Sequence, residues 1–482
     1  MSQVLEYFKL VSSIPRGSGH EKLISNAMIK FARNHKLEVR RDKANNVYIY
    51  KPAMGGMWDS EPIILQGHLD MVWEKDKDTE FDFLTNGINL EVEGDFISAK
   101  GTTLGADNGV AIAYMMAILA DKTLLHPRLC CVMTTEEETG MGGAASLVPE
   151  YIEGKILINL DTDNEGEFLV SCAGGARCEI TADISYVNVD ADEIGFNIRV
   201  GGLLGGHSGA EIHKERGNAN IIMAQILDVL IDEFDIGIAT IDGGTKDNVI
   251  TRECDAIISI KEADRERLFK RITELESNIY STFKSHDGGV LISILPCEIT
   301  KKIVNKRQIV DILLLSPNGI IEMSQEISGL VQTSLNMGVV DTTDDKVSVI
   351  FAVRSSKESS KQLIIKKLSN IARVLNINFK CYSEYPAWEY NEKSKIRDRA
   401  VQLYREMYKI EPDEEGPEIK AIHAGLECGF LTEKIPDVDI IAFGPNVYDI
   451  HTPKERMSIS SFERVYEFLV KLLAKTEVKI EN

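Results

Sequence analysis

The sequence lacks three features: an excess of basic residues, a long apolar run and paired cysteines. Its 54 lysines and arginines face 75 acidic residues, and the net charge of −21 argues against nucleic acid or an anionic membrane as a partner. No apolar run approaches the roughly 20 residues of a membrane span, and no basic segment precedes an apolar one at the N-terminus. The eight cysteines show no C-x-x-C spacing. We therefore expect reduced core thiols in a soluble, cytoplasmic protein.

What the sequence does contain is a series of short apolar runs that end in potential metal ligands. Near-continuous apolar runs that alternate with helices are typical of parallel strands buried on both faces. In such sheets ligands lie beyond the carboxyl ends of the strands. The runs are 62–66 before His68 and Asp70, 129–133 before Glu136, Glu137 and Glu138, 156–160 before Asp161, and 438–443 before His451.

Asp107 stands in a glycine-flanked turn, 104–109, directly before a stretch of apolar residues and glycine that runs to Ala120. This stretch predicts a helix that is buried on nearly all sides. A buried acid at its start either caps the helix or binds metal. The acids and histidines expected at the same sheet edge favour a metal-bridging role for Asp107.

A common hydrolytic site holds two metal ions about 3.5–4 Å apart that share a carboxylate and a water. Here Asp107 would bridge, His68 and Asp161 would complete one ion, and Glu138 and His451 the other. Asp70 would accept the second ring N–H of His68 and fix its tautomer. The glutamate run 136–138 supplies a further acid for the proton of the water. The alternatives are a solvated charge cluster for this run and core histidines for His68 and His451.

The middle of the chain has the pattern of a separate α/β domain. Strands are predicted at 196–200, 256–260 and 346–353, and helices at 264–283 and 356–375. If His451 joins the earlier ligands, this block is an insertion in the first domain. The predicted division is 1–184 and 388–482 for the catalytic domain and 185–387 for the insertion.

Six motifs together identify a family resemblance. They lie at 67–70, 105–109, 137–140, 159–161, 205–209 and 423–427. Their order and spacing resemble the aminoacyl-histidine dipeptidases, also called Xaa-His or cytosol non-specific dipeptidases. These enzymes belong to the clan of dizinc exopeptidases and aminoacylases. Aminoacylases and tripeptidases of the same clan are the alternatives, together with a non-catalytic, metal-dependent peptide-binding protein, which would have no use for a general base.

The resemblance implies an α/β fold in which a dizinc catalytic domain with a mainly parallel sheet is interrupted by a large α/β lid domain, often in a homodimer formed through the lid. It implies two zinc ions, for which cobalt or manganese can substitute, and hydrolysis of dipeptides with free termini, including Xaa-His and β-alanyl-histidine. Matched by position, the resemblance implies metal ligands at His68, Asp107, Glu138, Asp161 and His451. It implies a general base at Glu137, with Asp70 behind His68, and an oxyanion contact at His207. It also implies substrate contacts at Asn248, Arg354 and Gly425. Asp247 and Thr251 stand where the family more often has a basic residue and a proline, which leaves the preferred side chains of the substrate open.

Overall fold

The computed structural model describes residues 2–476, and the chain separates into two units. Unit 1 comprises Met1–Ser171, Tyr390–Ala421 and Leu426–Asn482, and unit 2 comprises Cys172–Glu389 and Ile422–Gly425. The first border thus falls between 171 and 172 and not between 184 and 185. The reason is that strand β9 (Gly174–Asp183) pairs with β20 (Lys346–Ser355) and β21 (Asn378–Tyr385) in the sheet of unit 2.

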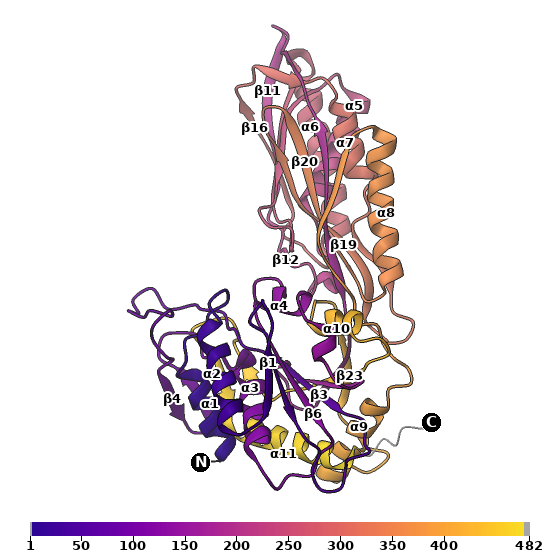
Figure 1. Cartoon of the computed structure of the whole chain (residues 1–482). Helices are drawn as coiled ribbons and strands as arrows, with labels where there is room; N and C mark the ends of the chain where they lie inside the picture. The colour runs from indigo at the N-terminus through magenta and orange to yellow at the C-terminus, as the bar shows by residue number, and fades with distance from the viewer. Residues whose placement is uncertain (1, 477–482) are drawn as a thin grey trace. The chain divides into compact units, whose positions relative to one another are not determined.

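Unit 1 is built on an eight-stranded sheet (Figure 1). In spatial order its strands are β1 (Glu38–Arg41), β2 (Val47–Lys51), β6 (Leu129–Thr134), β3 (Ile63–His68), β7 (Ile156–Asn159), β23 (Asp439–Ala442), β8 (Glu167–Cys172) and β22 (Glu418–Ile422). The four central strands, β6, β3, β7 and β23, pair in parallel, while β1, β2 and β8 pair antiparallel. Every residue of β3, β6 and β7 is buried, as their unbroken apolar sequences predict.

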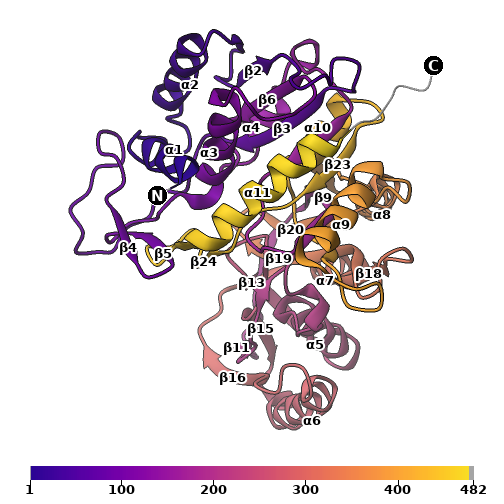
Figure 2. The same ribbon diagram turned by 90° about the horizontal axis from the view of Figure 1, so that it is seen from below.

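The helices of unit 1 pack against this sheet and help to bury its central strands. They are α1 (Gln3–Ser12), α2 (Lys22–Asn34), α3 (Ala106–Ala120), α4 (Gly142–Ala145), α9 (Lys395–Tyr408), α10 (Cys428–Lys434) and α11 (Ile459–Lys475), with a 3-10 turn η1 at Pro149–Tyr151. Helix α3 contacts β3, α1 and α11, and Figure 2 shows α11 alongside it. This enclosure explains why α3 is apolar on all sides. None of the described helices is long and apolar enough to cross a membrane.

A small four-stranded sheet completes unit 1. Its order is β24 (Val447–Tyr448), β25 (Arg456–Ser458), β5 (Phe96–Ala99) and β4 (Leu90–Glu93). Strands β4 and β5 account for part of the segment that alternates acids with apolar residues between 76 and 99. Because β24 and β25 flank His451, this sheet holds the ends of the loop that carries that histidine.

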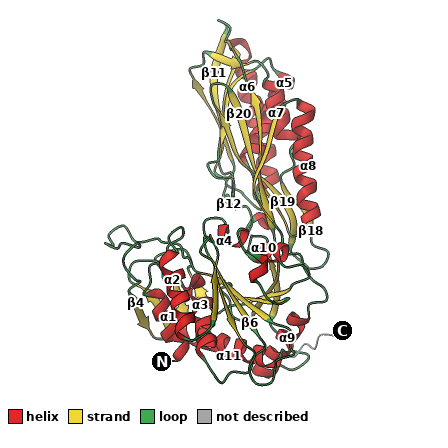
Figure 3. Cartoon of the chain, viewed as in Figure 1, coloured by secondary structure: helices red, strands yellow, loops and turns green. Residues whose placement is uncertain are grey.

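Unit 2 is a sheet of nine strands with four helices on one face, shown in red beside the yellow strands in Figure 3. The main order is β16 (Leu291–Cys297), β11 (Glu193–Gly201), β15 (Cys254–Lys261), β13 (Gly237–Gly243), β19 (Val331–Thr342), β20, β9 and β21, with β18 (Gly319–Met323) beside β19. The helices are α5 (Ala219–Glu233), α6 (Arg265–Phe283), α7 (Lys306–Leu315) and α8 (Glu358–Leu375). Short pieces are β10 (Tyr186–Asn188) with β17 (Lys301–Ile303), β12 (Gly206–His207) with β14 (Val249–Ile250), and 3-10 turns η2 (Ile212–Lys214) and η3 (Glu262–Asp264). The strand pairs of this sheet are antiparallel. The middle block has a hydrophobic core of its own.

Candidate metal centre

The predicted ligands of unit 1 gather at the carboxyl ends of the parallel strands. His68 is the last residue of β3, Asp161 follows the end of β7 by two residues, and Glu138 lies in the turn after β6. Asp107 lies in the first turn of α3, and His451 in the loop between β24 and β25. Parallel pairing puts the three strand ends at one edge, and the α3 turn and the His451 loop meet them there.

Asp107 lies at the centre of this group and presents one oxygen to each side of it. Its Oδ1 is 3.0 Å from Nε2 of His68, and Oδ1 of Asp161 is 3.5 Å from the same nitrogen. Its Oδ2 is 3.1 Å from Nε2 of His451, and Oε2 of Glu138 is also 3.1 Å from that nitrogen. The five side chains thus form two sets of donors that share the Asp107 carboxylate.

The donor spacing fits metal ions. Two donors that each lie about 2.0–2.1 Å from a tetrahedral ion are about 3.4 Å apart, close to the separations within both sets. Oε1 of Glu138 is buried and has no hydrogen-bond partner among the described residues, so it is free to bind an ion. Ligand atoms of His68, Asp107 and Glu138 also lie within 4.8 Å of one another. The residues therefore fit one divalent ion on each oxygen of Asp107.

In the protein without metal, crowding and burial shift the pKa values of the acids and histidines in this group. Burial raises the pKa of Asp161 to about 6, and it raises the pKa of Glu137 well above its ordinary value, to which the Asp161 carboxylate adds. Hydrogen bonds to Asp107 and Glu138 raise the pKa of His451 to about 10. Crowded carboxyl groups in a dry site resist ionisation, and bound cations reverse that tendency.

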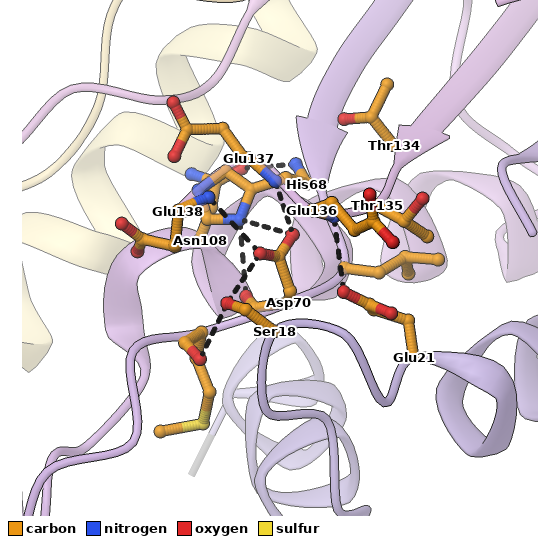
Figure 4. Close-up of polar contacts among 12 residues, drawn as sticks. Ser18, Glu21, His68, Asp70, Asn108, Thr134, Thr135, Glu136, Glu137 and Glu138 are labelled. Atoms are coloured by element: carbon orange, nitrogen blue, oxygen red, sulfur yellow. Dashed lines mark hydrogen bonds and ion pairs between the residues drawn. The ribbon is translucent and has the colours of Figure 1, made fainter. Parts of the chain in front are cut away.

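Asp70 holds the surrounding groups in place and is fully buried (Figure 4). Its Oδ1 lies 3.4 Å from Nδ1 of His68, and its backbone oxygen lies 3.2 Å from the same nitrogen. Nδ1 of His68 therefore carries a proton, and Nε2, which faces Asp107, is the ring nitrogen that would bind an ion. Asp70 also accepts hydrogen bonds from the hydroxyl of Ser18 at 2.8 Å and from the backbone N–H groups of Glu137 and Glu138 at 3.2 and 3.3 Å.

The three consecutive glutamates face different surroundings. Glu136 is exposed, and its backbone N–H donates to the carboxylate of Glu21 at 3.2 Å. Glu138 contacts His451. Glu137 is partly buried and lies near the group without touching either histidine. Of the three, Glu137 is thus the partly buried acid that lies beside the group without an ion pair to His68 or His451 among the described residues.

Three buried charged residues of unit 1 were not predicted as part of the site. Glu427 accepts hydrogen bonds from Nε2 of Gln66 at 2.5 Å and Oγ1 of Thr134 at 2.6 Å, and its burial raises its pKa to about 7. Arg16 and Glu455 hold the turn that carries Asp107. Glu427 belongs to a motif used for the family resemblance, whereas nothing in the local sequence marks Arg16 or Glu455.

A second polar group lies within unit 2 around Gly209. A Cβ at Gly209 would lie 3.0 Å from Cε1 of His207 and 3.2 Å from Nε of Arg354, so these two side chains flank the glycine. Nδ1 of His207 accepts hydrogen bonds from the N–H groups of Gly209 at 3.2 Å and Ala210 at 3.0 Å. His207 therefore carries its proton on Nε2 and can donate it. Burial, with Arg354 nearby, lowers its pKa, which keeps the ring neutral.

Arg354 is a buried guanidinium without an acidic partner. Its side chain donates to the hydroxyl of Tyr385 at 3.1 Å, and among residues 2–476 no carboxylate forms an ion pair with it. Its Nε is buried and has no acceptor. A buried charge is costly unless it is paired, so this geometry suits an anionic ligand.

The remaining predicted residues of unit 2 lie in neighbouring segments. The carbonyl of Asn248 accepts a hydrogen bond from the N–H of Ser208 at 2.9 Å, next to His207. Asp247, which departs from the family pattern, forms an ion pair with Arg177. Gly425 ends the short segment Ile422–Gly425 of unit 2. Asn248 is thus brought close to His207 through its backbone.

The chain is similar to known peptidases over most of its length. Residues 64–475 match the family described as Peptidase family M20/M25/M40. The cytosol non-specific dipeptidase of Escherichia coli is 33% identical over 98% of this chain and 97% of its own length. The crystal structure of aminoacylhistidine dipeptidase from Vibrio alginolyticus is 32% identical, with a TM-score of 0.92 over 98% of this chain and 96% of that one. An aminopeptidase structure from Bacillus cereus, 15% identical with a TM-score of 0.57 over 98% of both chains, shares the fold.

Proposed function

Because the chain belongs to peptidase family M20/M25/M40, we propose that it is a cytoplasmic metallo-dipeptidase that hydrolyses dipeptides with free termini. The names of the two similar proteins, a non-specific dipeptidase and an aminoacylhistidine dipeptidase, support dipeptides, including Xaa-His, as substrates. We include β-alanyl-histidine among the proposed substrates. The single observation that carries the metal chemistry is the Asp107 carboxylate, which faces His68 with one oxygen and His451 with the other. The proposed cofactor is a pair of zinc ions, for which cobalt or manganese can substitute.

The proposed ligands divide between the two oxygens of Asp107. His68 and Asp161 would hold one ion, and Glu138 and His451 the other, with Asp107 shared. When bound, the pair would supply Lewis acidity that lowers the pKa of a water and polarises the scissile carbonyl. Asp70 faces Nδ1 of His68, which leaves Nε2 as the ring nitrogen that would bind the ion.

The protein's own groups move the protons. Glu137 would take a proton from the attacking water and pass it to the nitrogen of the leaving amino acid. Its place in the chain supports this role, because Asp70 fixes the backbone N–H groups of both Glu137 and Glu138. With their backbones fixed in this way, Glu137 would act as the base and Glu138 as a metal ligand.

Unit 2 would recognise the substrate and act as the lid. No carboxylate of residues 2–476 forms an ion pair with Arg354, which supports its pairing with the free C-terminal carboxylate of a dipeptide. His207, with its proton on Nε2, would donate to the oxyanion that forms in the transition state. Asn248 and Gly425 would line the same substrate site.

A substrate panel tests this proposal. The metal-loaded protein is assayed on dipeptides, tripeptides and N-acetyl amino acids, each with and without a chelator. We expect turnover of dipeptides that is lost in chelator. Preference for tripeptides or N-acetyl amino acids would identify a tripeptidase or an aminoacylase instead, and binding without turnover would identify a peptide-binding protein.

We further propose a homodimer formed through unit 2. Strand β16 is at the edge of its sheet, and Leu291 and Leu295 on it are 58% and 63% exposed. An exposed apolar edge strand is a surface that another chain can extend. Light scattering of the protein and of a Leu295→Lys variant tests this: a dimer that the substitution dissociates supports the proposal, and a monomeric native chain contradicts it.

A further inference from the structure

Glu455 is a buried carboxylate that lies four residues after His451, and it is only 2% exposed. Its Oε2 accepts the N–H groups of Leu104 and Gly105 at 2.8 and 2.9 Å. Its Oε1 accepts those of Ala106 at 2.8 Å and Asp107 at 3.4 Å. One side chain thus satisfies four consecutive backbone donors of the turn that leads into α3, two of them before the helix begins at Ala106.

Arg16 holds the same turn from its carbonyl side. Its guanidinium donates to the carbonyl of Gly105, and also to the carbonyls of Leu69 at 3.1 Å and Asp70 at 2.8 Å. Gly105 has a φ of +71°, and a Cβ there would lie 2.5 Å from Nη2 of Arg16. The turn before Asp107 is therefore held between a carboxylate and a guanidinium, both buried.

Glu455 also belongs to the loop that carries His451. Its own N–H donates to the carbonyl of Thr452 at 3.1 Å, and the next residue, Arg456, starts β25. The ring of His451 is 45% exposed, so few protein contacts hold it in place. The Glu455 side chain is the link between this loop and the backbone of Asp107.

We propose that Glu455 is a positioning residue for the metal centre, which sets Asp107 and His451 at the separation that one ion requires. The inference rests on the proposed dinuclear function. It is distinct from ordinary helix capping, because a cap would stabilise α3 without affecting metal affinity. Because Glu455 also belongs to the loop of His451, its replacement should change metal affinity. Metal affinity therefore distinguishes a positioning residue from a helix cap.

The test is Zn²⁺ titration of the chelator-treated full chain by calorimetry, with thermal unfolding of the metal-free protein measured in parallel. Glu455→Gln is compared with Glu463→Gln, the same change at an exposed position of α11. We expect the native chain and Glu463→Gln to bind two ions per chain. We expect Glu455→Gln to weaken the ion held by His451 about 10–100-fold, the usual range for groups that orient metal ligands.

His451→Ala identifies which binding step belongs to that histidine. If Glu455 acts through His451 and Asp107, the variant with both His451→Ala and Glu455→Gln should lose less affinity than the sum of the two single changes. Glu455→Asp keeps the charge but shortens the reach, and the same weakening is expected of it should the glutamine variant not fold. Unchanged Zn²⁺ affinity with a lower unfolding temperature would reduce Glu455 to a helix cap. A native chain that binds no second ion would instead contradict the proposed function itself.

Discussion

Replacement of Arg354 by alanine tests how a metallopeptidase could be restricted to dipeptides. If the guanidinium holds the C-terminal carboxylate, Arg354→Ala removes a buried, charge-assisted contact worth about 2–4 kcal/mol. At about 1.4 kcal/mol per factor of ten, KM for a free dipeptide should rise about 30- to 700-fold. The same dipeptide with an amidated C-terminus has no carboxylate to lose, so its kinetics should hardly change.

The structure also predicts the effect of this substitution on stability. Arg354 has no carboxylate partner among the described residues, so its removal leaves no acidic group unpaired. We expect the free energy of unfolding to stay the same or to rise, since a buried, unpaired cation is lost. An unchanged or higher free energy of unfolding would indicate that Arg354 serves binding and not folding stability.

The assay compares kcat and KM for matched free and amidated dipeptides in four proteins: the native chain, Arg354→Ala and two control variants. Arg354→Lys keeps the charge without the planar fork, and Arg373→Ala removes an exposed arginine of α8 in the same unit. The lysine variant should fall between the native chain and Arg354→Ala, and Arg373→Ala should match the native chain. Equal losses on free and amidated substrates in Arg354→Ala would remove this arginine from carboxylate recognition.

Three further predictions concern the chemistry. Glu137→Gln should keep its metal and lose about 10²–10⁴-fold or more in kcat, whereas Glu138→Gln should weaken the binding of one ion. Metal analysis and turnover measurements distinguish the two variants. Interchanged phenotypes would mean that the two roles are shifted by one residue. His207→Ala should lower kcat with little change in KM, because an oxyanion contact strengthens in the transition state, and a change confined to KM would contradict that role. Chelation should abolish activity, and zinc, cobalt or manganese should restore it; full activity in excess chelator would exclude a metal-dependent mechanism.

The family and the α/β fold predicted from the sequence are confirmed by the comparisons. The central strands could be predicted because each is an apolar run that ends in a polar group, and parallel pairing then brings His68, Glu138 and Asp161 to one edge. The helix after Asp107 could be predicted from the sequence because its residues after Asn108 are almost all apolar. The roles of these ligands stay predictions.

What the sequence could not reveal depends on contacts between distant segments. Strand β9 has the same alternation whichever sheet it joins, and only its pairing with β20 and β21 assigns it to unit 2. Glu455 and Arg16 look like ordinary surface charges in the sequence, yet they meet the turn at 104–107 from 348 and 89 residues away. Neither leaves a local pattern, because each acts on backbone groups and not on a matching side chain.

The central claim is that Asp107 is shared by two metal ions, and anomalous X-ray diffraction at the zinc edge from crystals of the zinc-loaded protein tests it most directly. We expect two anomalous peaks about 3.5–4 Å apart, one beside Oδ1 of Asp107 with His68 and Asp161, and the other beside Oδ2 with Glu138 and His451. A single peak, or a second peak away from the Asp107 carboxylate, would contradict it.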